Sequence, residues 1–283
     1  MIPMNALDPR LNPYRRDLAA RHLQGQVEAA RFADGTVYEV IHGQAPLRRT
    51  PAHDGALDTE ALYGERVMVY DMDEEGWAWG QLETDGYVGY LPAAALVRPG
   101  AAPTHKIVVP RTLGFPGPDI KLPPFVALPL GARVAIARQQ PPFAVTAAGL
   151  HLPANHLAPL TAKEPDFVAV AERFSGTPYL WGGKTSLGLD CSGLVQVALH
   201  AAGIACARDS YRQETTHGWP VMLANLRRGD LIFWKGHVAI ARDEETLIHA
   251  NAHHMAMAIE PVAQAVARIH AAGSEVTSVR RMP

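Results

Sequence analysis

The feature that most constrains the fold of this chain is a glycine-rich segment that ends in a cysteine at the expected start of a helix. Residues 179–194 read Tyr-Leu-Trp-Gly-Gly-Lys-Thr-Ser-Leu-Gly-Leu-Asp-Cys-Ser-Gly-Leu, and residues 229–240 form an apolar strand pattern that leads into His237. A helix N-terminus lowers the pKa of a thiol, and an imidazole can take or hold its proton. The pairing of Cys191 with His237 therefore indicates thiol chemistry on a domain whose helices precede its strands.

The expected elements of this region run from helices to strands. Apolar residues at helical spacing predict helices over 166–174 and 191–200, joined by a glycine-rich loop over 176–189. Beyond them we predict four strands, a helix and a last strand, over 230–235, 237–242, 246–250, 255–259, 261–272 and 276–280. This order is typical of an α+β domain in which helices pack on an antiparallel sheet.

The N-terminal half has a different pattern. Its first residues are polar, and we predict a helix over Arg15–Ala30. Short β-rich runs separated by turn signals then predict a small β-barrel, and a weaker, proline-rich β-pattern after it is interpreted as a second barrel related to the first. The expected organisation is an N-terminal helical segment, two small β-barrels and the α+β domain, over 1–30, 31–98, 104–162 and 163–283.

Composition narrows the class of protein. The chain has 283 residues, which suits two or three domains, and 48% of them are hydrophobic, as in a globular protein with a real core. The formal net charge is −2 and no basic stripe stands out, so we expect neither nucleic acid nor an anionic membrane as a partner. Neither a secretory signal nor a bilayer-spanning apolar run is evident, and we therefore expect a cytoplasmic protein.

The chain has two cysteines, Cys191 and Cys206. If one helix follows Cys191, a rise of about 1.5 Å per residue separates the two Cα atoms by roughly 20 Å. A disulfide needs less than about 7 Å between its Cα atoms. We therefore predict two free thiols, with Cys206 as a buried structural residue.

Several linked motifs resemble one known family. The Tyr-x-Trp-Gly-Gly loop, the Asp-Cys-Ser-Gly helix start, the Gly-Asp-Leu strand running into His-Val, and a polar residue on the next strand occur here in that order. Residues 163–283 thereby resemble the NlpC-type cell-wall peptidases, which are papain-like cysteine hydrolases. Residues 62–67 and 85–91 resemble bacterial SH3-like domains. The combination is similar to the γ-D-glutamyl-L-diamino acid endopeptidases of dipeptidyl-peptidase VI type.

The resemblance assigns catalytic roles. Cys191 would be the nucleophile, although a small buried hydrophobe is the alternative for any cysteine. His237 would be the general base and then the general acid to the leaving amine. His249 would orient His237, with His253 and His254 close enough in sequence to compete for that assignment. The backbone N–H of Cys191 is a candidate oxyanion donor.

It also suggests residues that bind substrate. Asp190 is either an N-cap for the helix or a carboxylate for a substrate ammonium, and both can hold. Ser192 and Ser210 match family positions near the substrate amine. Tyr179 and Trp181 could line the same pocket, although loop aromatics are more often packing residues.

In the recycling branch of the family, the first barrel contributes a tyrosine and a glutamate to the recognition of a free N-terminal amine. By motif position these would be Tyr87 and Glu65, with Tyr90 as a substitute for Tyr87. The alternatives are a barrel-core tyrosine and a surface glutamate.

The activity implied is a cysteine endopeptidase that cuts between γ-D-Glu and meso-diaminopimelate or Lys in murein tripeptides or tetrapeptides with a free N-terminal L-Ala. A broader hydrolase of N-blocked wall peptides, and a peptidoglycan- or protein-binding module with a weak catalytic site, are the alternatives. No cofactor is expected. The histidines near 249–254 lack a convincing metal-ligand spacing, so we predict no metal.

Overall fold

A computed structural model describes residues 7–282 of the chain. The molecule divides into two compact units: the first includes the chain up to Leu160 except Val108–Arg111, and the second consists of Val108–Arg111 together with the chain from Thr161 onward. Within residues 7–282, no helix is both long enough and apolar enough to cross a lipid bilayer.

The N-terminal segment is extended rather than helical, so the helix predicted over Arg15–Ala30 is wrong. Strand β1 (Leu18–Ala20) pairs in parallel with β2 (Arg31–Ala33), and a single 3-10 turn follows β1. Gly25 has a φ of 83°, which breaks any continuous helix here. Leu18 is fully buried against Trp79 of the first barrel, so tertiary packing holds this segment.

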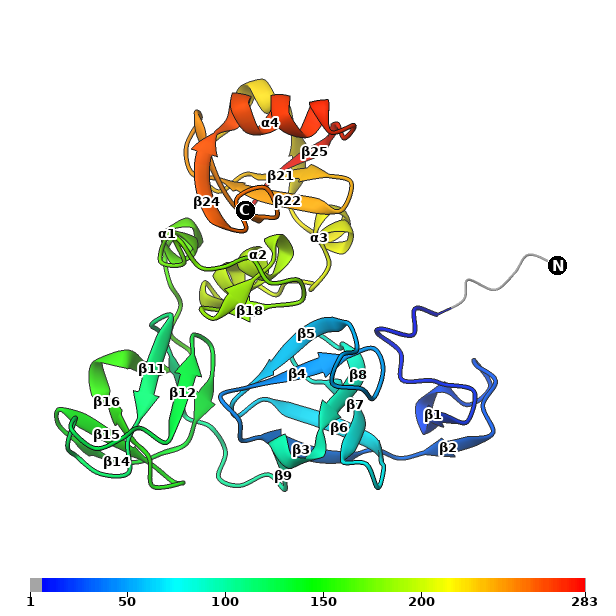
Figure 1. Cartoon of the computed structure of the whole chain (residues 1–283), viewed down its shortest axis with the longest axis vertical. Helices are drawn as coiled ribbons and strands as arrows, with labels where there is room; N and C mark the ends of the chain where they lie inside the picture. The colour runs from blue at the N-terminus through cyan, green and yellow to red at the C-terminus, as the bar shows by residue number, and fades with distance from the viewer. Residues whose placement is uncertain (1–6, 283) are drawn as a thin grey trace. The chain divides into compact units, whose positions relative to one another are not determined.

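The first barrel is a seven-stranded antiparallel sheet with the order β5-β4-β8-β7-β6-β3-β9 (Figure 1). Burial alternates along β6, where Val67 and Val69 are buried and Met68 between them is partly exposed. A 3-10 helix, η2 (Ala93–Ala95), leads into the last strand. The strands are β3 (Thr36–Val40), β4 (Gln44–Arg48), β5 (Leu57–Leu62), β6 (Arg66–Met72), β7 (Trp77–Leu82), β8 (Val88–Pro92) and β9 (Leu96–Val97).

Residues 105–159 form three small sheets rather than one continuous barrel sheet, with the orders β13-β10-β17, β11-β12 and β14-β15-β16. Their end repeats the end of the first barrel, because an antiparallel pair is followed by a proline, the 3-10 helix η3 (Ala154–His156) and a last strand. The strands are β10 (His105–Ile107), β11 (Arg111–Gly114), β12 (Val126–Pro129), β13 (Arg133–Val134), β14 (Ile136–Gln140), β15 (Phe143–Thr146), β16 (His151–Pro153) and β17 (Leu157–Pro159).

Two glycines let the first barrel meet this second region at backbone distance. A Cβ on Gly43 would lie 2.0 Å from the carbonyl oxygen of Ala127, and one on Gly64 would lie 2.1 Å from that of Arg133. Beside the second contact, the Arg133 N–H donates to the Tyr63 carbonyl at 2.9 Å. Any larger residue at either glycine would push the two β regions apart.

The second unit is built on a six-stranded antiparallel sheet with the order β20-β25-β21-β22-β23-β24. The predicted helices and strands of this region are confirmed within one or two residues at most ends, whereas α3 and β20 were not predicted. The helices are α1 (Phe167–Glu172), α2 (Cys191–Ala201), α3 (Ser210–Thr216) and α4 (Val262–Ala271). The strands are β20 (Trp219–Val221), β21 (Leu231–Trp234), β22 (His237–Ala241), β23 (Thr246–Asn251), β24 (Ala256–Pro261) and β25 (Val276–Arg281).

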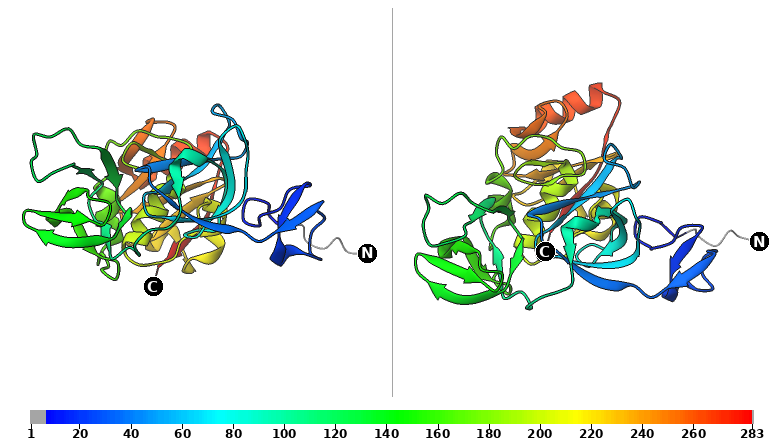
Figure 2. Two further views of the ribbon diagram at one scale, coloured as in Figure 1. Left: turned by 90° about the horizontal axis from the view of Figure 1, so that it is seen from below. Right: turned by 60° about the horizontal axis from the view of Figure 1, so that its bottom comes forward.

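Helices cover both faces of the central strands. Ala239 and Ala241 of β22 share a cluster with Val262 and Ala265 of α4. The alternate residues Val238 and Ile240 are also buried, on the face where α2 packs against β22 and β23. Figure 1 shows α4 and α2 on opposite sides of this sheet, and Figure 2 gives two further views. The strands that carry His237 and His249 are therefore packed against helices on both faces of the sheet.

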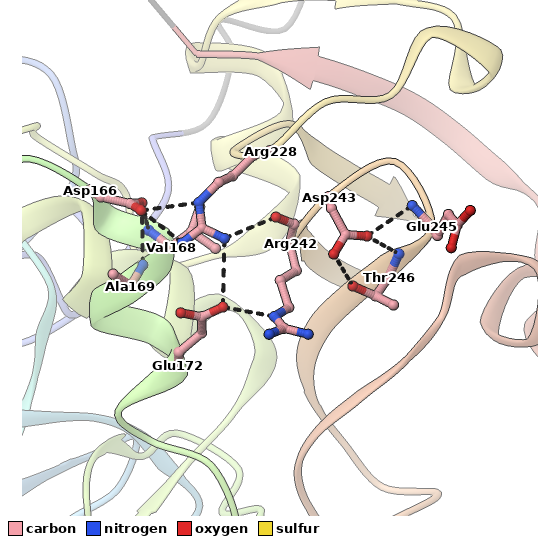
Figure 3. Close-up of polar contacts among 9 residues, drawn as sticks. All are labelled: Asp166, Val168, Ala169, Glu172, Arg228, Arg242, Asp243, Glu245 and Thr246. Carbon is pink, nitrogen blue, oxygen red and sulfur yellow. Dashed lines mark hydrogen bonds and ion pairs between the residues drawn. The ribbon is translucent and has the colours of Figure 1, made fainter.

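Surface ion pairs join α1 to the sheet (Figure 3). Asp166 caps the first turn of α1 and accepts hydrogen bonds from two backbone N–H groups, at 2.9 and 3.2 Å. Its other oxygen lies 2.7 Å from an Arg228 nitrogen, and Arg228 also donates to the Arg242 carbonyl at the end of β22. Glu172 accepts from Arg242 at 2.8 Å. These contacts connect α1 to the segments just before β21 and just after β22, at the open end of that hairpin.

Candidate active site

Cys191 is the first residue of α2 and is 8% exposed. Asp190 caps the helix, with its side chain accepting from the Gly193 N–H at 2.7 Å. The preceding loop folds back on this turn, because a Cβ on Gly193 would lie 2.3 Å from the Gly183 carbonyl oxygen. The glycines around the cysteine are thus required for a close backbone approach, which places Cys191 at the junction of loop and helix.

The Asp190 carboxylate holds several segments together. One oxygen accepts from Arg208 at 2.9 Å and from Ser192 at 3.3 Å, in addition to the cap bond. The other accepts from Arg208 at 2.7 Å and from the Gly182 N–H at 2.8 Å. The N-cap interpretation of Asp190 is therefore realised. A substrate ammonium would have to share the Asp190 carboxylate with these donors or displace one of them.

Arg208 is a site residue that the sequence reading missed. Its side chain is 2% exposed and forms a two-point pair with Asp190, while also donating to the Ser192 hydroxyl at 3.0 Å and the Gly183 carbonyl at 3.3 Å. Arginine presents planar donors that match a carboxylate in this way. The only sequence signal was an arginine shortly before Ser210.

His237 and His249 lie side by side, with His237 Nε2 and His249 Nδ1 2.9 Å apart. They come from the start of β22 and from β23, and the backbone pairing of these strands is confined to Ile240–Ile248 and Ala241–Leu247. Both histidines lie outside this paired stretch of backbone, so the contact between the two strands at this point is made by the histidine side chains. The other ring nitrogen of His237, Nδ1, takes no part in this contact.

The neighbouring histidines do not share this position. His254 is exposed and its Nδ1 lies 3.0 Å from the Asn251 side-chain oxygen, and its ring centroid is 6.5 Å from that of His249. His253 is exposed on the same turn. Of these three, His249 is therefore the histidine that contacts His237.

His249 has a further partner that was not predicted. Its Nε2 lies 2.6 Å from Oε1 of Glu260 on β24, and Arg268 of α4 donates to the same oxygen. His249 is fully buried, and the Glu260 side chain is 10% exposed. Glu260 directly precedes Pro261 and resembles an ordinary surface glutamate in the sequence.

Burial controls the electrostatics of the pair. Burial, and then the charge of Asp190, raises the pKa of Cys191 to about 12, although the backbone N–H groups of Val238 and Ser192 oppose this. Burial, and then His249 and Arg268, lowers the pKa of His237 to about 3. The Ser192 N–H at the helix start does lower the thiol pKa, as expected, but desolvation and the charge of Asp190 outweigh it, so the net shift is upward. The resting pair is a neutral thiol and a neutral imidazole.

The contact with Val238 also locates the thiol. The backbone N–H of Val238 contributes to lowering the pKa of the Cys191 thiol, which places the sulfur near β22, at the residue that follows His237 in sequence. The arrangement can support nucleophilic catalysis with a neutral base.

The other predicted substrate-binding residues of this unit differ in accessibility. Tyr179 is half-buried, and burial together with the charges of Cys191 and Asp190 raises its pKa to about 12, which places its hydroxyl near both groups. Trp181 is 68% exposed, whereas Ser192 and Ser210 are buried. Tyr179 and Ser192 are thus brought to the cysteine.

The two residues predicted from the first barrel have distinct environments. Tyr87 is 2% exposed and belongs to the barrel core, and Tyr90 accepts a hydrogen bond from Arg15. Glu65 is 4% exposed, and its Oε2 accepts from the Leu62 N–H at 3.0 Å. Its Oε1 is buried with no hydrogen-bond partner among residues 7–282. The interpretation of Glu65 as a surface residue is therefore wrong.

One group of side chains meets the geometric requirement for a metal site. Ligand atoms of His249, His254 and Glu260 lie within 4.8 Å of one another. However, Arg268 already places a cation on the Glu260 oxygen, which opposes a metal ion there. The absence of a metal cofactor stays a prediction. Neither Cys191 nor Cys206 forms a disulfide, as predicted.

Comparisons with known proteins match both parts of the chain. Residues 176–273 match the NlpC/P60 family, and residues 47–96 match the bacterial dipeptidyl-peptidase SH3 domain. The chain is similar to dipeptidyl-peptidase 6 of Lysinibacillus sphaericus, with 35% identity over 35% of this chain and 36% of that protein. It is also similar to a γ-D-glutamyl-L-lysine dipeptidyl-peptidase of Bacillus cereus, with 27% identity over 73% of this chain and 71% of that protein.

A solved structure supports the fold. The crystal structure of an NlpC/P60 family protein from Bacillus cereus matches with a TM-score of 0.74 and 21% identity, over 88% of this chain and all of that one. These matches show a segment of the NlpC/P60 family at 176–273, preceded by a segment of the bacterial dipeptidyl-peptidase SH3 type at 47–96. The similarity to the solved structure supports the fold alone.

Proposed function

We propose that this chain is a cysteine endopeptidase that cuts the bond between γ-D-Glu and a diamino acid in murein peptides with a free N-terminal L-Ala. The observation that carries the proposal is the linked set of Cys191, His237 and His249. The cysteine contacts the strand of the first histidine, and the two histidines are 2.9 Å apart. The bond that is cut is proposed from the γ-D-glutamyl-L-lysine dipeptidyl-peptidase activity named for the Bacillus cereus relative.

In the proposed reaction the Cys191 sulfur attacks the γ-carbonyl carbon of D-Glu, and the thiol proton moves to Nδ1 of His237. Because burial disfavours a free thiolate, transfer to His237 accompanies the attack rather than preceding it. The oxyanion that forms would accept a hydrogen bond from the backbone N–H of Cys191. His237 then protonates the leaving amine, the C–N bond breaks, and a thioester remains.

Hydrolysis of the thioester uses the same residues in reverse. His237 removes a proton from water, the hydroxide attacks the carbonyl, and the thiolate leaves and regains the proton. The products are L-Ala-D-Glu and a peptide or amino acid that begins with the diamino acid. Every proton transfer passes through Nδ1 of His237, while its Nε2 stays bonded to His249.

Recognition of the free amine needs carboxylates. Glu65 supports this part of the proposal because one of its buried oxygens has no partner among the described residues, and an ammonium would satisfy it. Asp190 would contribute by sharing its lone pairs, with Ser192 and Ser210 as hydroxyl partners. An N-blocked peptide would leave such a carboxylate unpaired, which disfavours intact wall polymer.

The architecture is part of the same proposal. We assign residues 31–98 and 104–162 as two SH3-like barrels and 163–283 as a papain-like domain. The shared ending of the two barrels, Leu-Pro followed by a 3-10 helix and a leucine at 96 or 157, supports their relation. A role in murein peptide recycling, and action in the cytoplasm, follow from the preference for free-amine fragments.

A hydrolysis assay tests the substrate. Purified protein is incubated with L-Ala-γ-D-Glu-meso-diaminopimelate, its Lys counterpart and the N-acetylated form of each, and products are identified by mass spectrometry. Cleavage of the free-amine peptides alone supports the proposal. Equal cleavage of the acetylated peptides favours a broader wall hydrolase, and failure to cut any of them favours a binding module.

The nucleophile has its own test. Cys191→Ala should abolish turnover and leave the circular dichroism spectrum unchanged, because the side chain is small and lies at a helix start. Cys206→Ala is the matched control, since Cys206 is also buried and forms no disulfide. Turnover by Cys191→Ala above a no-enzyme blank would contradict the assignment.

A further inference from the structure

We propose that Glu260, held by Arg268, is a positioning residue that sets the proton arrangement of the whole histidine pair. This inference rests on the proposed function, because it concerns which nitrogen of His237 receives the thiol proton. Neither residue was predicted from the sequence. The geometry that points to them is the line of contacts from β22 through β23 and β24 to α4.

The first step is the position of Glu260. In the ladder between β23 and β24, His249 lies opposite Ala258 and Leu247 lies opposite Glu260. Glu260 is therefore a diagonal neighbour of His249 on the same face of the sheet, within reach of a long side chain. Its Oε1 lies 2.6 Å from His249 Nε2, a short distance typical of a hydrogen bond to a charged group.

The second step is the direction of the hydrogen bonds. An ionised carboxylate can only accept, so His249 Nε2 must carry a proton. A neutral His249 then has a bare Nδ1, which accepts from His237 Nε2–H across 2.9 Å. His237 in turn has a bare Nδ1, the nitrogen that the proposed reaction uses as its base. Each step follows from the one before it, beginning at Glu260.

The third step is neutrality, because a protonated histidine would donate from both nitrogens and break this order. Burial, followed by the charges of Arg268, His254 and His253, lowers the pKa of His249 to about 3. Burial and the charge of Arg268 act on His237 in the same direction. Near neutral pH each ring therefore carries a single proton.

The fourth step is the role of Arg268. It lies in the last turn of α4 and donates to the same Glu260 oxygen as His249. The Glu260 side chain is 10% exposed, so a neighbouring cation compensates its charge. Arg268 thus fixes the rotamer of Glu260 from one side while His249 fixes it from the other.

The experiment compares Glu260→Ala with Glu260→Gln and with a matched control, Glu275→Ala. Glu275 also pairs with a histidine, His270, at 2.9 Å, but both side chains are more than half exposed. Three readouts are used: kcat and KM on the free-amine peptide, the rate of Cys191 alkylation by iodoacetamide, and the tautomers of His237 and His249 from ¹⁵N chemical shifts of histidine-labelled protein.

We expect Glu260→Ala to lower kcat and the alkylation rate about 10- to 100-fold, with KM unchanged, the range found when a group that orients a catalytic ligand is removed. The ¹⁵N shifts should show His249 leaving the Nε2–H tautomer. Glu260→Gln should recover part of the loss, since its amide oxygen can accept the Nε2–H. Glu275→Ala should match the parent protein.

An unchanged His249 tautomer in Glu260→Ala, or unchanged kcat and alkylation, would overturn the proposal. If Glu260→Ala does not fold, Glu260→Leu decides, because its side chain has a similar volume and no acceptor. Unchanged tautomers, rate and alkylation in that variant would overturn the proposal. Alkylation and tautomers need no peptide. They therefore separate a failure of this inference from a failure of the proposed substrate.

Discussion

Two helices of the peptidase unit, α1 and α2, each begin at an aspartate that caps the helix and pairs with an arginine. One of these pairs is exposed to solvent and the other is buried. Asp166 caps α1 and pairs with Arg228, Asp190 caps α2 and pairs with Arg208, and the closest nitrogen–oxygen distance is 2.7 Å in both pairs. The side chains of the first pair are 42% and 40% exposed, whereas those of the second are 10% and 2% exposed. Geometry alone therefore does not distinguish a surface contact from an active-site element.

The two pairs differ in whether water can solvate the charges once the pair is broken. If the α1 pair breaks, both charges are solvated at once, so an exposed pair contributes about 0–1 kcal/mol to stability. If Arg208 is removed, the Asp190 carboxylate stays buried next to Cys191 without its cation. The buried pair thus holds the start of the helix at Cys191 rigidly, and the exposed pair fastens a helix to the surface of the sheet.

The largest expected effect is that of Arg208→Ala. It should lower the free energy of unfolding by about 3–5 kcal/mol, because removing one partner leaves an uncompensated buried charge. Peptidase activity should fall with it, since Asp190 also holds the start of α2. Calorimetry on the full chain, with Arg228→Ala alongside, measures the contrast. Equal losses in the two variants would mean that burial does not decide the strength of these pairs.

The next effect is a pH dependence that extends the comparison of buried and exposed groups to histidines. His237 has a folded pKa of about 3 against an ordinary value of 6.5, so between these pH values the unfolded chain binds a proton that the folded chain does not. Stability is complete above pH 6.5 and falls as pH falls, by up to about 1.4 kcal/mol per pH unit for this residue.

Urea denaturation of the parent protein and of His237→Gln between pH 4.5 and 6.5 measures this contribution. The variant should show the shallower dependence, because burial-lowered groups such as His249 and His217 remain in both proteins. The carboxylates with lowered pKa values titrate below this window. Parallel curves for the two proteins would contradict a buried neutral His237.

The smallest effect is that of Arg228→Ala. Loss of the exposed contacts to Asp166 and Glu172 should lower the free energy of unfolding by less than about 1 kcal/mol. The loss should shrink further as salt is raised from 0.05 to about 1 M, since salt screens exposed charges. A larger, salt-independent loss would show that α1 is held by more than a solvated pair.

Much of the peptidase fold was predicted from local pattern. Helix α2 begins at Cys191 because Asp190 is a cap and apolar residues follow at helical spacing, and all of these contacts lie within one or two turns. The strands carrying His237 and His249 were predicted for the same kind of reason, from runs of β-branched and apolar residues bounded by turns. The N-terminal helix failed because Leu18 is held by Trp79, a contact across the barrel that no local pattern contains.

The candidate active site shows the same division between features that local sequence predicts and features that depend on tertiary contacts. The sequence by itself determined that Cys191 begins a helix and that His237 begins a strand. Only the tertiary structure decided the partners, since Asp190 meets Arg208 eighteen positions away and His249 meets Glu260 through the register of β23 on β24. It also decided the thiol pKa, because the helix terminus is a local feature whereas desolvation depends on everything that packs around the sulfur. Interactions within a helical turn depend on residues that are close in sequence and can be predicted from it. Burial and sheet register depend on residues far apart in sequence and are set only when the whole chain has folded.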